Sequence, residues 1–299
     1  MASTPAATVT LTNTTPRGEL LTATYSPNSG MNLTSYTCGG VEVIDPNTSS
    51  LFDERNAGLG ALIGPHFHEN PVAPLDFDHS IFPHVDTVLA NGRKDPFSHG
   101  IARYVPWAHH HSDTQIQAKL CGYHTYHNTP LTTFEGQDFS MTYNARLLNT
   151  GLFIRYSITS ALPSLIGLHY YYALYNEPAI VSGEVDPVYR EGDEWKPLPE
   201  KYLKTRTTHL YLPAEGAIDY GLIPRKRDEK ERDYRILLST PTYDLHIEFA
   251  TASLSEFSYQ LYRPQESSYI CIEPLSARQP RRPTLTTSTL EVKLQIFPK

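Results

Sequence analysis

Four titratable side chains lie far apart in the chain, in apolar or turn-like surroundings. They are His99, His169, Asp219 and Glu273. Carboxylates are rarely buried without a partner, so a glutamate after the apolar run 269–272 must be solvated, paired or used in chemistry. A carboxylate facing an imidazole can take a proton from one oxygen while a proton is given to another. These residue types therefore point to proton transfer.

Strands are the elements that must position the two groups best suited to this chemistry. Residues 268–273 are rich in Tyr, Ile and Cys, which favour a pleated, buried surface. Pro274 cannot donate to a sheet ladder, so we expect the strand to end there and to leave Glu273 where the sheet meets a loop. His169 lies in a second apolar and aromatic run, 165–172.

The composition favours a fold made of many strands. The 299 residues include 20 Tyr, 11 Phe and 24 Pro, and only 19% are charged. Such a balance is typical of strands joined by proline-containing loops. Residues 184–207 are polar and contain prolines, which predicts a surface loop. We expect one β-rich domain covering residues 1–299. Alternating or β-branched segments predict strands at 7–12, 20–25, 138–148 and 152–159.

Charge and hydropathy exclude several classes of partner. The net charge of −7 argues against binding to a phosphate backbone, so we expect no nucleic-acid partner. The first residues carry neither a basic region nor an apolar run, and nowhere do 18 apolar residues follow one another. We therefore expect a cytoplasmic protein without a membrane partner. Cys38, Cys121 and Cys271 lack metal-type spacing and are expected to be reduced core residues.

Histidine clusters leave a metal site open as an alternative. His66, His68 and Glu69 have metal-like spacing, and 109–111 is a run of three histidines. Neither cluster is followed by an obvious third and fourth ligand, so we expect no metal and an exposed position for 109–111. The alternative is a metal-dependent jelly-roll enzyme that uses His66, His68 and Glu69.

Four motifs, in this order along the chain, resemble the galactose mutarotase or aldose 1-epimerase superfamily. The resemblance implies a large antiparallel β-sandwich whose concave face binds a sugar. It also implies a cofactor-free interconversion of the α and β anomers of a hexose or hexose 6-phosphate. The motifs are His99-Gly-Ile-Ala-Arg103 with Trp107 after it, Gly167-Leu-His169-Tyr-Tyr-Tyr172, Ala217-Ile-Asp219-Tyr220 and Cys271-Ile-Glu273-Pro274.

The resemblance implies catalytic roles for two residues. Glu273 would act as general base on the anomeric hydroxyl, and His169 as general acid on the ring oxygen. His169 would then hold a proton at neutral pH, which a nearby carboxylate can support. Ring opening, rotation about C1–C2 and closure from the other face would give the other anomer, with the proton roles reversed.

The resemblance also implies sugar-binding residues. His99 would hydrogen-bond the sugar near its ring oxygen, and Asp219 would accept hydrogen bonds from sugar hydroxyls. Trp107 or Tyr172 would supply a stacking face for the ring. We expect a small-molecule sugar or sugar phosphate as the ligand, and a monomer or weak homodimer.

The arginine positions leave the substrate open. Arg103 matches the phosphosugar branch of the superfamily. The positions where relatives carry other sugar-contacting or phosphate-contacting arginines hold Ala57 and Pro65, although Arg55 or Arg93 could serve nearby. A bidentate arginine is what an anionic ligand gains most from. These departures favour the alternative of a non-catalytic carbohydrate-binding or regulatory β-sandwich.

Overall fold

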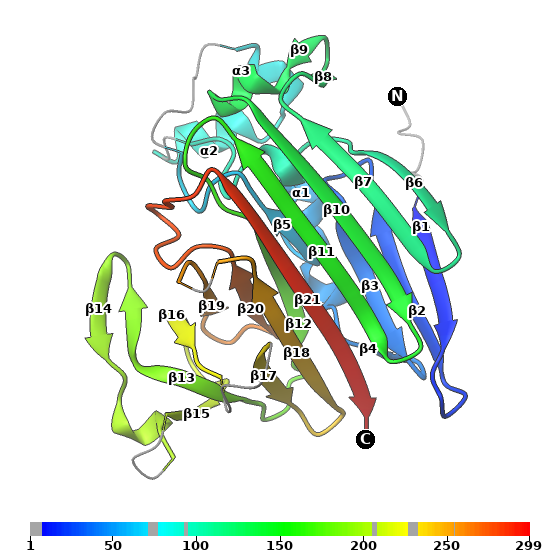
Figure 1. Cartoon of the computed structure of the whole chain (residues 1–299), viewed down its shortest axis with the longest axis vertical. Coiled ribbons are helices and arrows are strands. Elements are labelled where there is room, and N and C mark those ends of the chain that lie inside the picture. Colours follow the sequence, from blue (N-terminus) through cyan, green and yellow to red (C-terminus); the bar gives the residue numbers. More distant parts are fainter. Residues whose placement is uncertain (1–7, 71–76, 93–94, 205–207, 227–232, 254) are drawn as a thin grey trace.

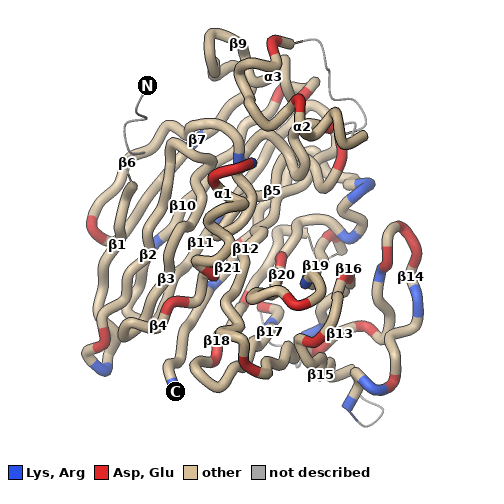
Figure 2. The backbone as a smooth tube through the Cα atoms, turned by 180° about the vertical axis from the view of Figure 1, so that it is seen from behind, with Lys and Arg blue, Asp and Glu red and all other residues tan. Residues whose placement is uncertain are grey.

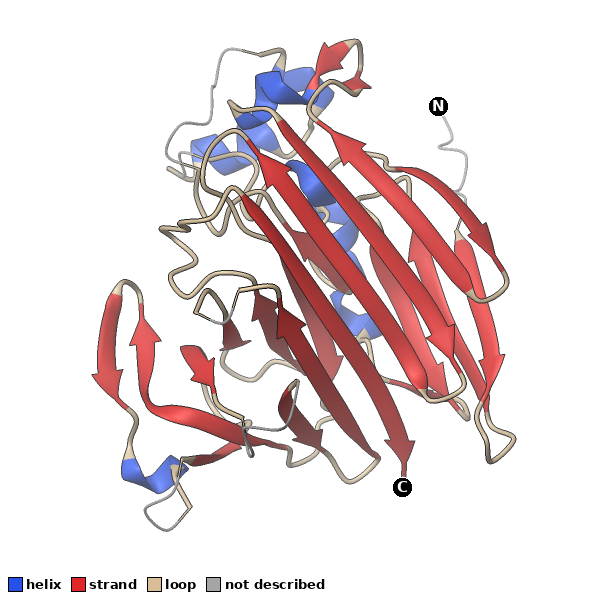
Figure 3. Cartoon of the chain, viewed as in Figure 1, coloured by secondary structure: helices blue, strands red, loops and turns tan. Residues whose placement is uncertain are grey.

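The computed structural model describes residues 8–70, 77–92, 95–204, 208–226, 233–253 and 255–299. Antiparallel strands dominate these residues (Figures 1 and 3). Within them the strands form a 15-stranded sheet, a 4-stranded sheet and a small 2-stranded sheet. The molecule is a large antiparallel β-sandwich, as predicted.

The 4-stranded sheet, called the small sheet below, comes from the beginning of the chain. Alternate residues of its strands, such as Leu11 and Ala23, are buried, as expected of a sheet with one face on a core. The predicted strands 7–12 and 20–25 correspond to its first hairpin. In order, its strands are β1 (Val9–Thr14), β2 (Leu20–Ser26), β3 (Asn32–Cys38) and β4 (Val41–Glu42).

The large sheet follows the order β5-β12-β20-β19-β16-β13-β17-β18-β21-β11-β10-β7-β6, with β14 and β15 paired to β13. One end of β13 pairs with β17 and the other with β16, so the sheet turns there. In Figure 1, β12 and β20 lie behind β11 and β21. The strands are β5 (Gly60–Ile63), β6 (Ala108–Ser112), β7 (Gln115–Cys121), β10 (Phe139–Leu148), β11 (Gly151–Ser160), β12 (Gly167–Ala173), β13 (Ile180–Glu191), β14 (Glu194–Pro197), β15 (His209–Pro213), β16 (Ile218–Pro224), β17 (Tyr234–Ser239), β18 (Tyr243–Thr251), β19 (Ser258–Arg263), β20 (Tyr269–Leu275) and β21 (Thr287–Pro298).

Tyrosine hydroxyls connect the layers inside the core. The hydroxyl of Tyr143 on β10 lies 3.3 Å from that of Tyr25 on β2 and 3.0 Å from that of Tyr170 on β12. All three side chains are fully buried. A buried hydroxyl is costly unless it is hydrogen-bonded. These three linked hydroxyls therefore fix the small sheet and both parts of the large sheet relative to one another.

Short helices lie near one end of the long strands and along the middle of the molecule, and one lies apart from them at the lower left of the view (Figure 3). The first α-helix ends at Arg55, and the next residue, Asn56, has a left-handed conformation and donates its N–H back to the last turn. No helix in the described ranges has both the length and the apolar character needed to cross a membrane. These elements are η1 (Pro46–Thr48), α1 (Ser49–Arg55), η2 (His79–Ile81), α2 (Val85–Ala90), η3 (Ile101–Arg103), α3 (Leu131–Glu135) and η4 (Glu200–Tyr202), with β8 (Thr125–Tyr126) and β9 (Thr129–Pro130) forming the two-stranded sheet.

The predicted surface loop at 184–207 is wrong over most of its length. Strand β13 continues to Glu191, and a turn at Gly192 leads into β14. Figure 2 shows charged residues of both signs on this hairpin, which projects from the body of the molecule. Its polar sequence therefore reflects a solvated hairpin. Residues 205–207 lie outside the described part of the chain.

Candidate active site

One row of side chains crosses the strands of the large sheet. Antiparallel pairing places Arg190 of β13 opposite Gly221 of β16. Gly221 lies opposite Gln260 of β19, which lies opposite Glu273 of β20. The pairing of β12 with β20 on either side of this row places His169 opposite Glu273. Directly opposite residues point to the same face, so the sheet itself brings these groups together.

A second row lies two residues further along the same strands. Asp219 is opposite Tyr262, Tyr262 is opposite Cys271, and Cys271 is opposite Tyr171. Residues two apart on a strand share a face, so the two rows form one surface. This surface supplies the floor of the site.

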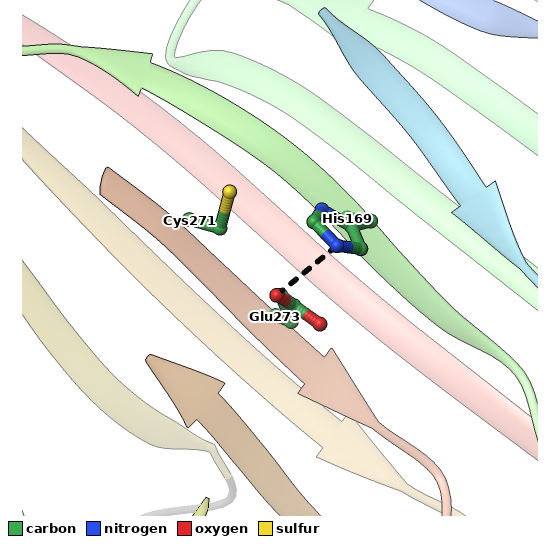
Figure 4. Close-up of side chains that lie close together, drawn as sticks. All are labelled: His169, Cys271 and Glu273. Atoms are coloured by element: carbon green, nitrogen blue, oxygen red, sulfur yellow. Dashed lines mark ion pairs between the residues drawn. The ribbon is translucent and has the colours of Figure 1, made fainter. Parts of the chain in front are cut away.

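The two residues to which the resemblance assigns the acid and base roles are in close contact. His169 Nε2 lies 3.4 Å from Glu273 Oε1 (Figure 4). The two side chains are only 8% and 2% exposed. Within the described residues, His169 Nδ1 and Glu273 Oε2 are buried without hydrogen-bond partners. Each group therefore keeps hydrogen-bonding capacity that the fold does not use.

The strand that carries Glu273 does not end at Pro274, contrary to prediction. Strand β20 continues to Leu275, so Glu273 lies within the sheet. Between the pairs Gly167–Leu275 and Tyr170–Ile272 the ladder that joins β12 to β20 is open. A proline is tolerated there because it lacks only a donor that an open ladder does not require.

A cavity of about 250 Å³ lies above these two rows. It brings together His99, Arg103, His169, Asp219 and Glu273 from the sequence motifs, and also Arg55 and His68, which the sequence analysis named for other roles. Its remaining lining includes residues that sequence reasoning did not place in the site, among them Phe67, Asp95, Ser98, Tyr171, Gln260, Tyr262 and Arg281.

Burial sets the protonation of the central pair. Burial, and then the charge of Arg103, lowers the pKa of His169 to about 3. Burial, and then the neighbouring Asp219, raises the pKa of the Glu273 carboxyl well above its usual value near 4.5. Both shifts favour the uncharged form of each group over the ion pair. This corrects the expectation that His169 holds the proton at neutral pH in the resting protein.

His99 reaches the pair from the segment before η3. Its ring lies edge-on to that of His169, with centroids 5.1 Å apart. The His68 N–H faces His99 Nδ1 at 3.4 Å, so Nδ1 is the acceptor and Nε2 carries the hydrogen. Burial, and then Arg103, lowers the pKa of His99, which makes it a neutral hydrogen-bonding group.

Asp219 lies at the exposed rim and is held by a chain of polar groups. Gln260 Nε2 donates to Asp219 Oδ1 at 2.5 Å, and Arg190 Nη2 donates to Gln260 Oε1 at 2.7 Å. Gln260 and Arg190 are buried. A Cβ at Gly221 would lie 2.7 Å from Arg190 Nη2, so glycine provides the space for this guanidinium. Gln260 and Arg190 carry no sequence motif, and only the strand register reveals them.

Arg103 forms part of the cavity wall and is buried. Its Nε donates to the Ser98 carbonyl at 2.9 Å, and its Nη2 contacts the same oxygen. Its charge contributes to the lowered pKa of both His99 and His169 after burial. Arg103 therefore shapes the electrostatics of the site while holding the segment that carries His99.

Both residues predicted to stack on the sugar lie elsewhere. Trp107 is in the core, where its indole N–H donates to the Ala102 carbonyl at 2.8 Å, and it does not line the cavity. Tyr172 is also buried outside the cavity. Residues 169 and 171 share one face of β12 and 172 faces away, so strand alternation would have excluded Tyr172. The aromatic lining consists instead of Phe67, Tyr104, Tyr171 and Tyr262.

The contacts of His66 and the exposure of Glu69 and of residues 109–111 do not suit a metal site. Both ring nitrogens of His66 contact carboxylates, Glu135 Oε1 at 2.7 Å and Asp95 Oδ2 at 2.8 Å. An imidazole with two acceptors donates from both nitrogens and has no lone pair for a metal. Glu69 is exposed, and so are residues 109–111, as predicted. Arg93 lies outside the described residues.

One group in the described part of the chain has potential ligand atoms close together. Atoms of His169, Cys271 and Glu273 lie within 4.8 Å of one another (Figure 4). Metal binding here would require a thiolate, whereas burial raises the pKa of the Cys271 thiol well above its usual value. The donor set therefore suits proton transfer better than metal ligation.

Solved structures share this fold over nearly the whole chain. A galactose mutarotase-like protein from Clostridium acetobutylicum is 12% identical, with a TM-score of 0.68 and coverage of 97% of this chain and 99% of that one. A galactose mutarotase-like protein from Lactobacillus casei is 14% identical, with a TM-score of 0.65 and coverage of 97% and 100%. The GalM/aldose epimerase homologue from C. elegans is 14% identical, with a TM-score of 0.65 and coverage of 98% and 99%.

At these identities the likeness establishes the fold. No family model matches the sequence, and no curated protein gives a significant match. The structural neighbours are described as aldose epimerase and galactose mutarotase-like proteins, and the likeness confirms the predicted fold.

Proposed function

We propose that this chain, which has the galactose mutarotase-like fold, is an aldose 1-epimerase that interconverts the α and β anomers of a hexose. The observation that carries the proposal is the contact between His169 and Glu273, 3.4 Å apart at the floor of the cavity. Anomerisation needs one group that accepts a proton and one that donates it, on neighbouring oxygens of the sugar. A buried carboxyl–imidazole pair that shares one proton can fill both roles.

The pair carries one proton throughout the reaction, on His169 at the start and on Glu273 after ring opening. Glu273 takes the proton of the anomeric hydroxyl while His169 gives a proton to the ring oxygen, and the ring opens. Rotation about C1–C2 presents the other face of the aldehyde. In closure His169 takes the proton back from the C5 hydroxyl and Glu273 returns its proton to the carbonyl oxygen. No proton is gained or lost over the cycle.

The lowered pKa of His169 and the raised pKa of Glu273 fit the middle of this cycle. After ring opening Glu273 is protonated and His169 is neutral, which is the state that burial favours. Burial therefore disfavours the ionic pair that begins the reaction and favours the pair that ring opening produces. The same environment lowers the free energy of the open-chain intermediate relative to the bound ring.

The rim and wall of the cavity supply groups that suit a sugar. Asp219 can accept hydrogen bonds from hydroxyls, and Gln260 holds its carboxylate in place. His99 carries a hydrogen on Nε2 and can donate to an oxygen. Tyr262 gives the apolar face of a pyranose an aromatic surface. Tyr171 stacks on His169 at 4.9 Å and so supports the orientation of the imidazole.

Arg55 favours a hexose phosphate as the substrate. It lies at the end of α1 and lines the cavity, and in the described residues its buried Nε has no hydrogen-bond partner. An adjoining hollow of about 550 Å³ between α1 and α2 shares Arg55, His84 and Val88 with the cavity. A guanidinium at this junction would bind a phosphoryl group through two parallel hydrogen bonds.

The decisive experiment replaces the proposed base. Glu273→Gln keeps the shape of the side chain and should lower anomer exchange of glucose and glucose 6-phosphate by roughly 10²–10⁴-fold, because the pair can no longer cycle a proton. Exchange NMR measures the rate, and thermal unfolding checks the fold. Glu248→Gln, on a solvent-facing pair with Arg235, is the matched control. Wild-type rates in Glu273→Gln would remove Glu273 from the mechanism.

The rival is a carbohydrate-binding protein without turnover. The absence of the two arginines at 57 and 65 favours it. Calorimetric titration with the same sugars separates the two functions. Binding that leaves the anomer exchange rate at its uncatalysed value would identify a binding protein, whereas catalysed exchange identifies the enzyme.

A further inference from the structure

His66 takes no part in the proposed reaction, yet it is among the most strongly held groups near the site. Its side chain is 12% exposed, and the two carboxylates that flank it, Asp95 and Glu135, are fully buried. Both ring nitrogens donate, so the imidazole is positively charged. We call His66, Asp95 and Glu135 the carboxylate–imidazole clip.

The clip holds both ends of the segment that carries His99. Asp95 Oδ1 accepts from the Phe97 N–H at 2.7 Å, and Glu135 Oε2 accepts from the Ile101 N–H at 3.3 Å. The two carboxylates come from distant parts of the chain and meet on one imidazole. His66 therefore ties the start of the segment to its end.

The held segment has little conformational freedom of its own. His99 has a φ of 68°, which is costly for a residue with a side chain. Gly100 packs so closely that a Cβ there would lie 2.0 Å from the Gly64 carbonyl oxygen. A strained residue persists only where surrounding contacts fix it. The clip supplies such contacts on either side of His99.

Asn70 also contacts both carboxylate residues of the clip. Asn70 donates from its backbone N–H to Asp95 Oδ2 at 2.9 Å, and from its side chain to the Glu135 carbonyl at 2.9 Å. Asp95 also lines the ligand cavity, whereas His66 does not. His66 thus lies behind the wall and can act on a ligand only through the wall.

We infer that His66 is a positioning residue: its imidazolium, clamped between Asp95 and Glu135, holds the 95–101 segment so that His99 meets His169 and the sugar in the cavity. The inference rests on the proposed function for the identity of the ligand, and on the geometry alone for the holding of the segment. Removing the charge leaves two buried carboxylates that repel each other and release the segment.

Hydrogen exchange tests the holding without any ligand. In His66→Gln, the amides of Phe97 and Ile101 should exchange about tenfold faster or more, because their acceptors are no longer fixed. His209→Gln removes another histidine–carboxylate pair, with Glu184, outside the cavity, and should leave these amides unchanged. If His66→Gln does not fold, Glu135→Gln offers the same test with one charge removed. Unchanged protection of both amides would overturn the inference.

Kinetics test whether the effect passes through His99. His66→Gln should raise KM for glucose 6-phosphate by roughly 10- to 100-fold with a smaller change in kcat, because a displaced binding group weakens the complex. In a His99→Ala background the same substitution should add less than threefold. A merely structural role would lower thermal stability without moving KM. An equal rise of KM in both backgrounds would contradict positioning through His99.

The two arms separate the inference from the proposed function. If the wild-type protein accelerates anomer exchange of neither glucose nor glucose 6-phosphate, the proposed function fails. Hydrogen exchange at Phe97 and Ile101 then still decides whether the clip holds the segment. If the wild-type protein is catalytic and His66→Gln changes neither the hydrogen exchange nor KM, the inference fails and the proposed function stands.

Discussion

Gly221 and Arg190 lie opposite each other on β16 and β13, and the guanidinium of Arg190 occupies the space that a side chain at 221 would need. Arg190 can reach Gln260 only across this glycine. The small residue is thus part of the site, although it contributes no chemical group.

Substituting Gly221 with alanine should push Arg190 aside and loosen the chain that ends at Asp219. We expect the sugar KM to rise by roughly 10-fold, because one charge-assisted hydrogen bond to Gln260 is lost. Steady-state kinetics of anomer exchange measure the effect. Adding the same substitution to Arg190→Ala should change little, and a further large rise there would argue against this route.

The pH dependence of kcat should follow the pair and not an ordinary histidine. The cycle needs one proton shared by His169 and Glu273. As the pH falls, the pair binds a second proton only near the lowered pKa of His169, about 3. As the pH rises, the pair loses its one shared proton at the raised pKa of Glu273. The rate should therefore not fall as the pH is lowered from 7 to 5, the range in which an unperturbed histidine gains its proton. A fall centred near pH 6.5 would show an unperturbed histidine instead.

Stability should decline on the alkaline side. Burial alone would lower the pKa of His66, but the charge of Glu135 and the hydrogen bonds raise it to about 10. A folded-state pKa above the unfolded value of 6.5 adds stability below pH 6.5 that is lost as the pH rises toward 10, at about 1.4 kcal/mol per unit.

Urea unfolding at pH 6.5, 8 and 9.5 measures this loss. His66→Gln should flatten the pH dependence and lower the stability at pH 6.5. Glu273 also has a raised pKa and contributes a loss of the same sign, so the comparison is made in a Glu273→Gln background. An equal decline with and without His66 would exclude the clip as its source.

Substitutions of Trp107 and Tyr262 should have opposite effects on stability and on sugar binding. Trp107→Phe removes a buried hydrogen bond and part of the core, and should lower the free energy of unfolding by roughly 1–3 kcal/mol while changing the sugar KM by less than threefold. Tyr262→Ala, at the partly exposed cavity wall, should raise KM by about tenfold with little effect on stability. Urea melts and kinetics on both variants test this contrast.

Arg55 should matter only for a charged substrate. Arg55→Gln is expected to raise KM for glucose 6-phosphate by roughly 10- to 100-fold and to leave that for glucose unchanged. Arg235→Gln, on a strand outside the cavity, is the control. Equal effects of Arg55→Gln on both sugars would assign the arginine to the fold or the wall.

Local patterns were sufficient for much of the fold. The alternation of residue types along 138–148 and 152–159 predicted β10 and β11, because a period of two marks a half-buried strand, and both strands show alternating burial. Pro274 misled because the rule against proline in a central strand assumes a complete ladder. The ladder is open at this point, and that depends on two strands distant in sequence.

The site divides in the same way. His169 and Glu273 stand in short motifs, so their residue types and surroundings could be read locally. Gln260 and Arg190 gain their place only from the register of β13, β16 and β19, which no local pattern encodes. The pairing of His66 with Asp95 and Glu135 joins three separate segments, so the spacing of His66 and His68 suggested a metal that the contacts do not favour.

The position of β21 affects how the chain is made. This strand, from residues 287–298, lies between β11 and β18 and pairs with both along most of its length. During synthesis, which adds roughly 5–20 residues per second, β11 and β18 present unpaired edges until these residues leave the ribosome. The nascent chain therefore exposes the edges of β11 and β18 to aggregation until β21 has emerged, and holding chaperones should engage it over that interval.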